Sequence, residues 1–189
     1  MARVEWTISN VLSLSRVILL VPIIYFLLDL NNERRPFAAA LMFLVALTDF
    51  LDGHLARRFH QETEFGRIID PLADKICAGA VVIVLAALGD LPGWFLVSVI
   101  GRDLLILLGG LYIAKTRDIV LPSNWAGKGA MGVVATLLIV ATLRAEFLES
   151  IKVILLWGSA ALLGLSLILY GKRFYDTVLV KPGVIERSS

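Results

Sequence analysis

Four aspartates with helical spacing lie within one short stretch of an otherwise apolar chain. They belong to the pattern Asp49-x2-Asp52-Gly53-x2-Ala56-Arg57-x8-Gly66-x3-Asp70-x3-Asp74. Hydrocarbon does not tolerate uncompensated carboxylates, so acids inside a membrane protein are functional candidates by default. Four converging acids also repel one another unless a cation lies between them. The pattern therefore predicts a divalent-metal site at the face of a membrane.

The spacing places the motif on two helix faces. One face carries positions i, i+3, i+4 and i+7, and the other carries positions i, i+4 and i+8. These are, in order, Asp49, Asp52, Gly53 and Ala56, and then Gly66, Asp70 and Asp74. Four acids on this grid can hold two Mg²⁺-like ions about 4 Å apart. All of these ligands are oxygen atoms, which favours a hard cation over zinc.

The small residues of the motif fit two roles. Gly53, Ala56 and Gly66 clear side chains from a patch beside the acids, and a glycine inside a helix costs about 1 kcal/mol relative to alanine. Close packing of membrane helices explains such a patch, and a slot for a planar base or a diphosphate explains it equally well. Arg57 fits either a phosphate contact or a snorkelling anchor at the interface.

Composition places the chain among membrane proteins. It has 189 residues, of which 58% are hydrophobic. The net charge of +2 is small and its basic residues are spread among loop ends, which argues against a nucleic-acid partner. The single cysteine, Cys77, excludes a disulfide framework within the chain.

Apolar runs of about 20 residues predict six transmembrane helices. The expected spans are residues 14–30, 37–57, 65–88, 94–114, 126–143 and 151–170. Residues 4–13 alternate apolar and polar side chains, which predicts a short amphipathic helix lying in the interface. We thus expect an all-α integral membrane protein that forms a single domain over residues 1–189. Residues 175–189 would be a short mobile tail.

The distribution of basic residues predicts the orientation. Eleven Lys and Arg residues lie on the side that holds the two termini and the second and fourth connections. Only Arg34, Arg35, Arg144 and Lys152 lie on the other side. We therefore expect a multi-pass protein of the cell (inner) membrane with both termini and the acidic motif in the cytoplasm.

The motif resembles the signature of the CDP-alcohol phosphatidyltransferase family at every fixed position, and the six-span layout extends the likeness over most of the chain. The resemblance implies a six-helix membrane enzyme that is usually a homodimer. Such an enzyme moves a phosphatidyl group from a CDP-linked lipid, here CDP-diacylglycerol, to an alcohol and releases CMP.

The resemblance also assigns roles to individual residues. Asp49, Asp52, Asp70 and Asp74 would hold two Mg²⁺ ions, for which Mn²⁺ is a substitute, and Asp74 would also be the general base. The nucleotide would be bound by Asp52, Gly53, Ala56, Arg57 and Gly66. An acceptor phosphate would be bound by two further cations, Arg102 and Lys128, although Arg102 can instead pair internally near Asp103.

The acceptor alcohol is less sharply indicated. The opening Asn10-Val11-Leu12-Ser13-Leu14-Ser15-Arg16, followed by Pro22, looks like the start of phosphatidylglycerophosphate synthases. The segment Asp70-Pro71-Leu72-Ala73-Asp74-Lys75 has the same likeness, and both segments also resemble CMP-forming cardiolipin synthases. The glycerol-phosphate enzymes carry a second arginine two turns after the position of Arg102, where this chain has Leu108-Gly109-Gly110. Glycerol 3-phosphate ranks first, phosphatidylglycerol second, and inositol phosphate or serine below both.

Two other classes of protein use acids within a membrane. An intramembrane prenyltransferase would need two aspartate-rich motifs and more spans, whereas this chain has one motif. A divalent-cation transporter would place its acids near the bilayer midplane and would show internal duplication, which this sequence lacks. Both rank below phosphatidyl transfer.

Overall fold

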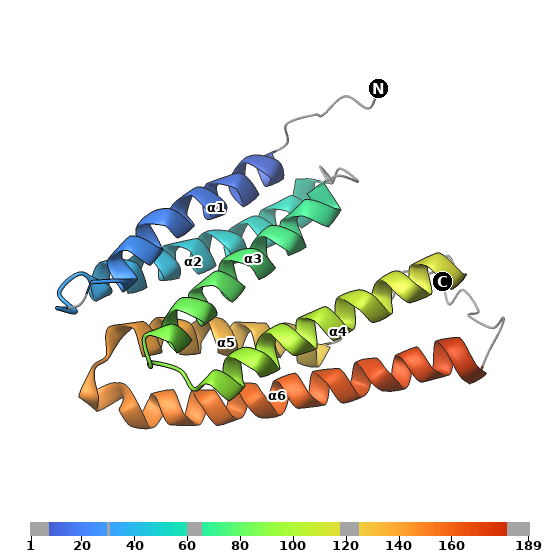
Figure 1. The fold of residues 1–189 in the computed structure, drawn as a ribbon. Coiled ribbons are helices and arrows are strands. Elements are labelled where there is room, and N and C mark those ends of the chain that lie inside the picture. The colour runs from blue at the N-terminus through green and yellow to red at the C-terminus, as the bar shows by residue number, and fades with distance from the viewer. Residues whose placement is uncertain (1–7, 30, 60–65, 118–124, 181–189) are drawn as a thin grey trace. The chain divides into compact units, whose positions relative to one another are not determined.

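The computed structural model describes residues 8–29, 31–59, 66–117 and 125–180, and these ranges are helical without a strand. Side chains are described at residues 15–29, 31–48, 75–113, 115–116 and 125–178. The elements are α1 (Ile8–Leu27), α2 (Arg35–Phe59), α3 (Gly66–Ala87), α4 (Gly93–Arg117), α5 (Trp125–Leu143), the short 3₁₀ helix η1 (Glu146–Leu148), α6 (Glu149–Tyr175) and the π-helical turn η2 (Asp176–Val180) (Figure 1).

The six apolar runs of the sequence all form helices. Three described helical stretches are long and apolar enough to cross a membrane: Gly93–Ile113, Trp125–Leu143 and Glu146–Val178. Shorter apolar stretches with described side chains are Ser15–Leu27, Arg35–Thr48 and Lys75–Ala87. The prediction of an all-α membrane fold is confirmed for the described residues, whereas the number of six spans stays a prediction.

The N-terminal segment differs from the expectation of a separate interfacial helix. Residues 8–13 form the first turns of α1 without a break, whereas residues 4–7 lie outside the described part of the chain. The reason is local, because neither Gly nor Pro interrupts the sequence before Pro22. At the other end, helical backbone continues through Val180, and the rest of the expected tail, residues 181–189, lies outside the description.

The connections form where turn residues lie in the sequence. Pro36 is the second residue of α2, where a missing N–H breaks no helical hydrogen bond. The loop between α3 and α4 turns at Gly89, whose φ of +78° is a left-handed conformation that favours glycine. Both sites agree with the breaks expected from the sequence.

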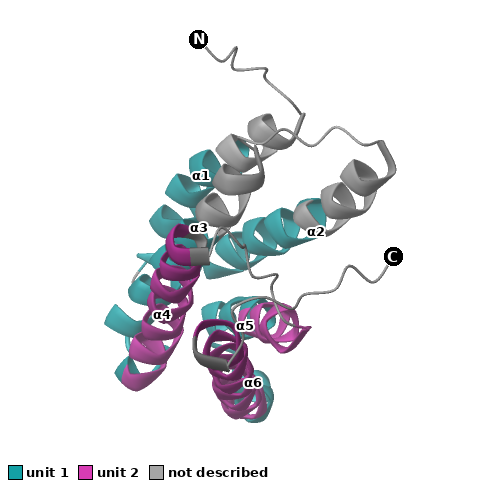
Figure 2. Ribbon diagram, turned by 90° about the vertical axis from the view of Figure 1, so that its right-hand side faces the viewer, with its two compact units in different colours: residues 1–93, 135–152 teal, residues 94–134, 153–189 magenta. Residues whose placement is uncertain are grey.

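The chain divides into two compact units, shown in teal and magenta in Figure 2. Unit 1 comprises residues 1–93 and 135–152, and unit 2 comprises residues 94–134 and 153–189. The expected single domain over residues 1–189 stays a prediction.

Unit 1 is built around α1, which packs along both α2 and α3 (Figure 1). Apolar side chains from these helices and from the second half of α5 make its core. They include Ile23, Leu27, Ala38, Val82, Leu85, Leu137 and Leu138. The hydroxyl of Thr142 on α5 lies 3.6 Å from the sulfur of Met42 on α2, so α5 reaches the first hairpin of the chain.

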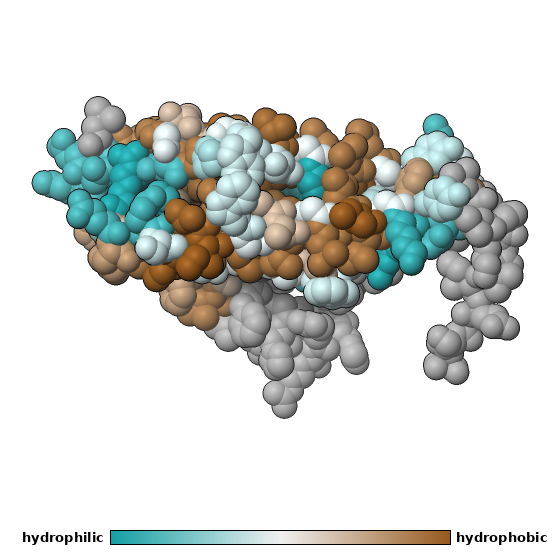
Figure 3. Space-filling view, turned by 90° about the horizontal axis from the view of Figure 1, so that it is seen from below, coloured by the Kyte–Doolittle hydropathy of each residue, from teal (hydrophilic) through white to brown (hydrophobic). Residues whose placement is uncertain are grey.

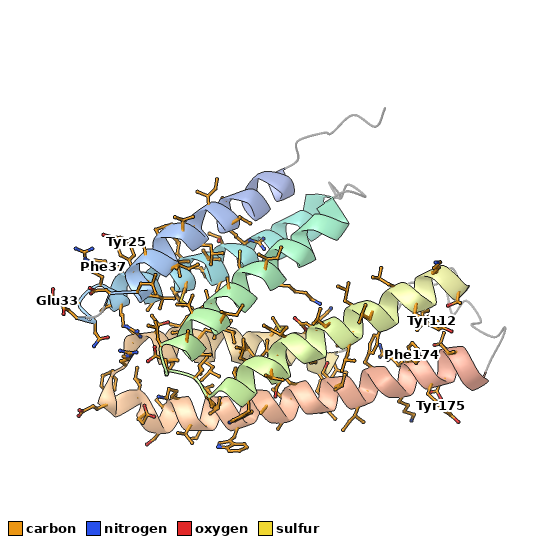
Figure 4. The ribbon with its side chains drawn as sticks, viewed as in Figure 1. Tyr25, Glu33, Phe37, Tyr112, Phe174 and Tyr175 are labelled. Atoms are coloured by element: carbon orange, nitrogen blue, oxygen red, sulfur yellow. The ribbon has the colours of Figure 1, made fainter. Side chains whose placement is uncertain are left out.

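Unit 2 contains a parallel pair of helices, α4 and α6. The Trp94 and Trp157 rings are stacked with their centroids 5.4 Å apart, and the Tyr112 and Phe174 rings meet at 6.0 Å (Figure 4). Between these ring pairs, the hydroxyl of Tyr170 donates to the backbone oxygen of Ile106 at 3.0 Å. The partners are 62 to 64 residues apart in every pair, and a constant offset of this kind means that the two helices run in the same direction.

Apolar side chains also cover the outside of these helices. Val97, Ile154 and Ile168 are each about 70% exposed in the isolated chain. On the face seen in Figure 3, hydrophobic residues cover much of the described surface. This distribution is typical of helices that face lipid.

Candidate active site

The acidic motif begins in the second half of α2 and ends in the first turns of α3, the next helix along the chain. Asp49, Asp52, Gly53, Ala56 and Arg57 lie in the second half of α2, and Gly66, Asp70 and Asp74 lie in the first three turns of α3. The helical backbone on which the two predicted faces depend is therefore present. The side chains of these residues lie outside the described ones, so their convergence and their roles stay predictions.

The donor set fits a hard divalent cation. On the helical backbone of α2, Asp49 and Asp52 are about 4.5 Å apart along the axis, and Asp70 and Asp74 on α3 are about 6 Å apart. All four residues offer carboxylate oxygens, the ligands that Mg²⁺ and Mn²⁺ prefer. The residues present are thus compatible with the expected magnesium site.

Arg16 is a buried cation to which the sequence pattern assigned no role in the site. It lies in the middle of α1 with a 9% exposed side chain. The helix that carries it, α1, packs along α3, whose first turns hold Asp70 and Asp74. The signal was available, because Arg16 is an ionisable residue inside the first predicted span.

Arg102 lies near the middle of α4 and is held from two directions. Its Nη1 donates to Oδ1 of Asp103 at 2.6 Å, and its Nη2 donates to Oγ of Ser166 on α6 at 2.6 Å. The Arg102 side chain is 9% exposed, and its Nε has no hydrogen-bond partner among the described residues. The contact with Asp103 agrees with the expected internal pair but leaves the acceptor role of Arg102 untested, and the contact with Ser166 was not foreseen.

Lys128, the second expected acceptor ligand, lies exposed in the first turn of α5. The structure thus places Arg102 in a buried setting and Lys128 at the surface of unit 2. Binding of an acceptor by either residue stays a prediction.

A second buried ion-pair cluster lies where three connections of unit 1 meet. Nη1 of Arg35 donates to Oδ2 of Asp90 at 2.8 Å, and the Nε of Arg144 donates to the other carboxylate oxygen. Arg144 also reaches Oδ1 of Asn32 at 3.0 Å and the backbone oxygen of Leu88 at 3.1 Å. We call Arg35, Asp90, Arg144 and Asn32 the Asp90 cluster. It joins the connections that the sequence analysis placed on the side opposite the motif.

The family of the chain follows from comparison with known proteins. The sequence profile of the CDP-alcohol phosphatidyltransferase family matches residues 6–165. The chain belongs to this family. The matched residues include the whole acidic motif, Arg102 and Lys128, and they end just before Ser166.

Curated relatives from this family carry closely related names. A protein of Mycobacterium tuberculosis named "Probable phosphatidylglycerophosphate synthase" is 39% identical over 127 residues, which is 64% of this chain and 58% of the relative. A protein of Bacillus subtilis named CDP-diacylglycerol–glycerol-3-phosphate 3-phosphatidyltransferase is 34% identical over 59% of this chain and 60% of the relative. A protein of Aquifex aeolicus with the same name is 32% identical over 78% of this chain and 82% of the relative. The match thus spans a little over half the length of the first two of these CDP-alcohol phosphatidyltransferases.

Proposed function

We propose that this protein transfers a phosphatidyl group from CDP-diacylglycerol to glycerol 3-phosphate, forming phosphatidylglycerophosphate and releasing CMP. The observation that carries the proposal is the family match over residues 6–165, which includes every residue of the acidic motif. The names of the relatives support glycerol 3-phosphate as the acceptor.

The proposed setting is the cell (inner) membrane, crossed six times, with both termini and the motif in the cytoplasm. The bias of basic residues supports this orientation. The Asp90 cluster supports the alternation of the spans but not the choice of side, because it joins three connections that alternate spans would place together. We also propose a homodimer, which rests on the family alone.

The proposed reaction assigns a task to each part of the motif. When Mg²⁺ is bound by Asp49, Asp52, Asp70 and Asp74, it would neutralise the diphosphate and polarise the phosphorus under attack. Asp74 would take the proton from the acceptor hydroxyl as that oxygen attacks.

The remaining residues of the motif would hold the nucleotide. Gly53, Ala56 and Gly66, together with Asp52, would form the cytidine slot, because small side chains let a planar base approach the helices. Arg57 would pair with the nucleotide phosphates, and Arg102 with Lys128 would bind the phosphate of the acceptor.

Phosphatidylglycerol is the second candidate acceptor, which would make the protein a CMP-forming cardiolipin synthase. The observation that favours it is the absence of a basic residue at Gly109 and Gly110. A side chain built at either position would lie 3.3 Å from the Tyr170 hydroxyl, so this place in unit 2 is already filled by an uncharged group.

The experiment is CMP release by the purified protein with Mg²⁺, CDP-diacylglycerol and one acceptor at a time. The panel is glycerol 3-phosphate, phosphatidylglycerol, inositol phosphate and serine, and the Asp74→Asn variant is the matched control. We expect release that depends on glycerol 3-phosphate and disappears in the variant. Release stimulated only by phosphatidylglycerol would establish the alternative. No release with any acceptor, combined with selective metal flux in liposomes, would favour a cation transporter and reject both.

A further inference from the structure

The contact between Arg102 and Ser166 is a polar link between side chains in the middle of the α4–α6 pair. Arg102 follows Trp94 by eight residues and precedes Tyr112 by ten, which are distances of about 12 and 15 Å along α4. Ser166 lies nine residues after Trp157 and eight before Phe174 on α6. The link therefore lies close to half-way between the two ring pairs that join these helices.

A buried guanidinium depends on its protein partners. Arg102 and Ser166 are 9% and 0% exposed, so the contact between them is largely shielded from solvent within unit 2. In such a medium each hydrogen bond to a charged group is stronger than in water. The partners of Arg102 thus determine which rotamer its long side chain adopts.

The two partners act on different parts of the guanidinium. Asp103 contacts Nη1, whereas Ser166 contacts Nη2. The N–H of Nε points along the edge that it shares with Nη2, away from Nη1, because the group is planar and rigid. The donor of Arg102 that has no partner among the described residues, the N–H of Nε, is therefore on the Ser166 side of the group and remote from the contact with the Asp103 carboxylate.

Ser166 is also the partner that comes from another helix. Asp103 is the next residue of α4, so it moves with Arg102, whereas Ser166 is 64 residues away and belongs to α6. A displacement of α6 relative to α4 therefore changes the contact with Ser166 and leaves the contact with Asp103 in place. The hydroxyl thus fixes the direction of the Nε edge within unit 2.

We propose that Ser166 is a positioning residue, which orients the Nε edge of Arg102 toward the phosphate of a phosphomonoester alcohol acceptor. The inference rests on the acceptor role proposed above for Arg102. It adds a residue beyond the segment that matches the family profile.

Two serine variants test the proposal. Ser166→Ala removes the partner of Arg102, and Ser159→Ala is the matched control. Ser159 is also 0% exposed on α6, but its hydroxyl donates within its own helix, to the backbone oxygen of Leu156 at 2.9 Å. Because a hydrogen bond to a charged group is involved, Ser166→Ala should raise the KM for glycerol 3-phosphate about tenfold. The KM for CDP-diacylglycerol and kcat should stay within about twofold, and Ser166→Thr, which keeps the hydroxyl, should restore the acceptor KM.

A second readout does not require turnover. Glycerol 3-phosphate, added without the CDP-lipid, should raise the melting temperature of the unaltered protein and of Ser159→Ala. The rise should be smaller in Ser166→Ala and absent in Arg102→Ala. This measurement also reports whether each variant is folded.

The outcomes separate the two proposals. If Arg102→Ala leaves the acceptor KM and the thermal shift unchanged, the acceptor role of Arg102 is wrong, and the role of Ser166 falls with it. If Arg102→Ala changes both quantities but Ser166→Ala behaves like Ser159→Ala, the acceptor role stands and the positioning role of Ser166 is overturned. Equal increases in the KM values for both substrates in Ser166→Ala would also overturn it.

Discussion

Arg35 in unit 1 and Arg102 in unit 2 are both buried arginines paired with an aspartate, yet the pairs differ in sequence distance. Arg35 is 1% exposed and binds Asp90, which is 55 residues away and also binds Arg144. Arg102 binds the adjacent Asp103 and reaches another helix only through the hydroxyl of Ser166. Both arginines leave a buried Nε without a partner among the described residues, so that atom does not distinguish them.

The ion pair of Arg35 therefore joins two segments that are distant in the chain, whereas the ion pair of Arg102 lies within a single helix. An ion pair between distant segments can stabilise the fold, because its rupture frees both segments. An ion pair between neighbours cannot, since the chain already holds the two residues together. Changes in the Asp90 cluster should therefore appear as lost stability, and changes at Arg102 should appear mainly in binding.

The largest effect is expected from Asp90→Asn. This change leaves the guanidinium groups of Arg35 and Arg144 without their shared carboxylate, and breaking a buried pair costs about 3–5 kcal/mol. Thermal melting in detergent should show a correspondingly large fall, with little change in either KM for the folded fraction. Asp29→Asn is the control, since the carboxylate of Asp29 accepts from the backbone N–H of Arg34 at an exposed site. A variant as stable as this control would remove the distinction between the two arginines.

Arg102→Ala should change binding more than stability. Loss of charge-assisted hydrogen bonds predicts an increase of about 100-fold in the KM for glycerol 3-phosphate, with a much smaller change in the KM for CDP-diacylglycerol. Steady-state kinetics with each substrate varied in turn measures both. Arg34→Ala, at an exposed arginine over the Tyr25 ring, is the matched control. Equal effects on both KM values would point to a structural role for Arg102.

Arg144 offers a smaller and sharper test of the Asp90 cluster. Its φ of +49° is left-handed, and its side chain contacts Asp90, Asn32 and the backbone oxygen of Leu88. Arg144→Ala should lower the free energy of unfolding by about 2 kcal/mol, because these contacts are lost while the strain remains. Arg144→Gly removes the strain as well, so it should be less destabilising by about 1 kcal/mol. The same stability for both variants would mean that the backbone conformation carries no strain.

The smallest effect concerns the packing that supports Arg102. A Cβ at Gly109 would lie 3.1 Å from Cε1 of Tyr170, so Gly109→Ala should lower stability by about 1 kcal/mol and shift the α4–α6 contact. Gly101→Ala, one residue before Arg102, meets nothing within 4 Å and should be neutral or slightly stabilising. Melting curves of the two variants give the comparison, and a stable Gly109→Ala protein would show that the Tyr170 ring moves freely.

The sequence predicted the helices well because their signals are local. Long apolar runs, Pro36 and Gly89 determined where helices form and end, and the helical spacing of the motif agrees with the backbone of α2 and α3. The separate N-terminal helix was wrong over residues 8–13, because amphipathic alternation does not interrupt a helix when no breaker follows. Whether the motif side chains converge stays a prediction.

The partners of the buried charges could not be predicted in this way. Arg102 and Ser166 meet because α4 pairs with α6 rather than only with its neighbours in sequence, and this depends on tertiary packing. Asp90 binds two arginines because three connections meet, although each connection alone resembles an ordinary polar loop. A buried arginine inside a span is visible in the sequence, but the residue that faces it is not.

The Asp90 cluster also implies an order of events during synthesis. Arg35 leaves the ribosome 55 residues before its carboxylate, and Arg144 follows that carboxylate by 54. In the proposed orientation, Arg35 crosses the membrane with the first hairpin before its partner Asp90 has been synthesised. Arg144 follows directly after the fifth helix, so its contact with Asp90 is the last of the cluster to form. A protein truncated before Arg144 would lack the contacts of this residue with Asp90, Asn32 and Leu88, so the cluster can be completed only after the fifth helix has been made.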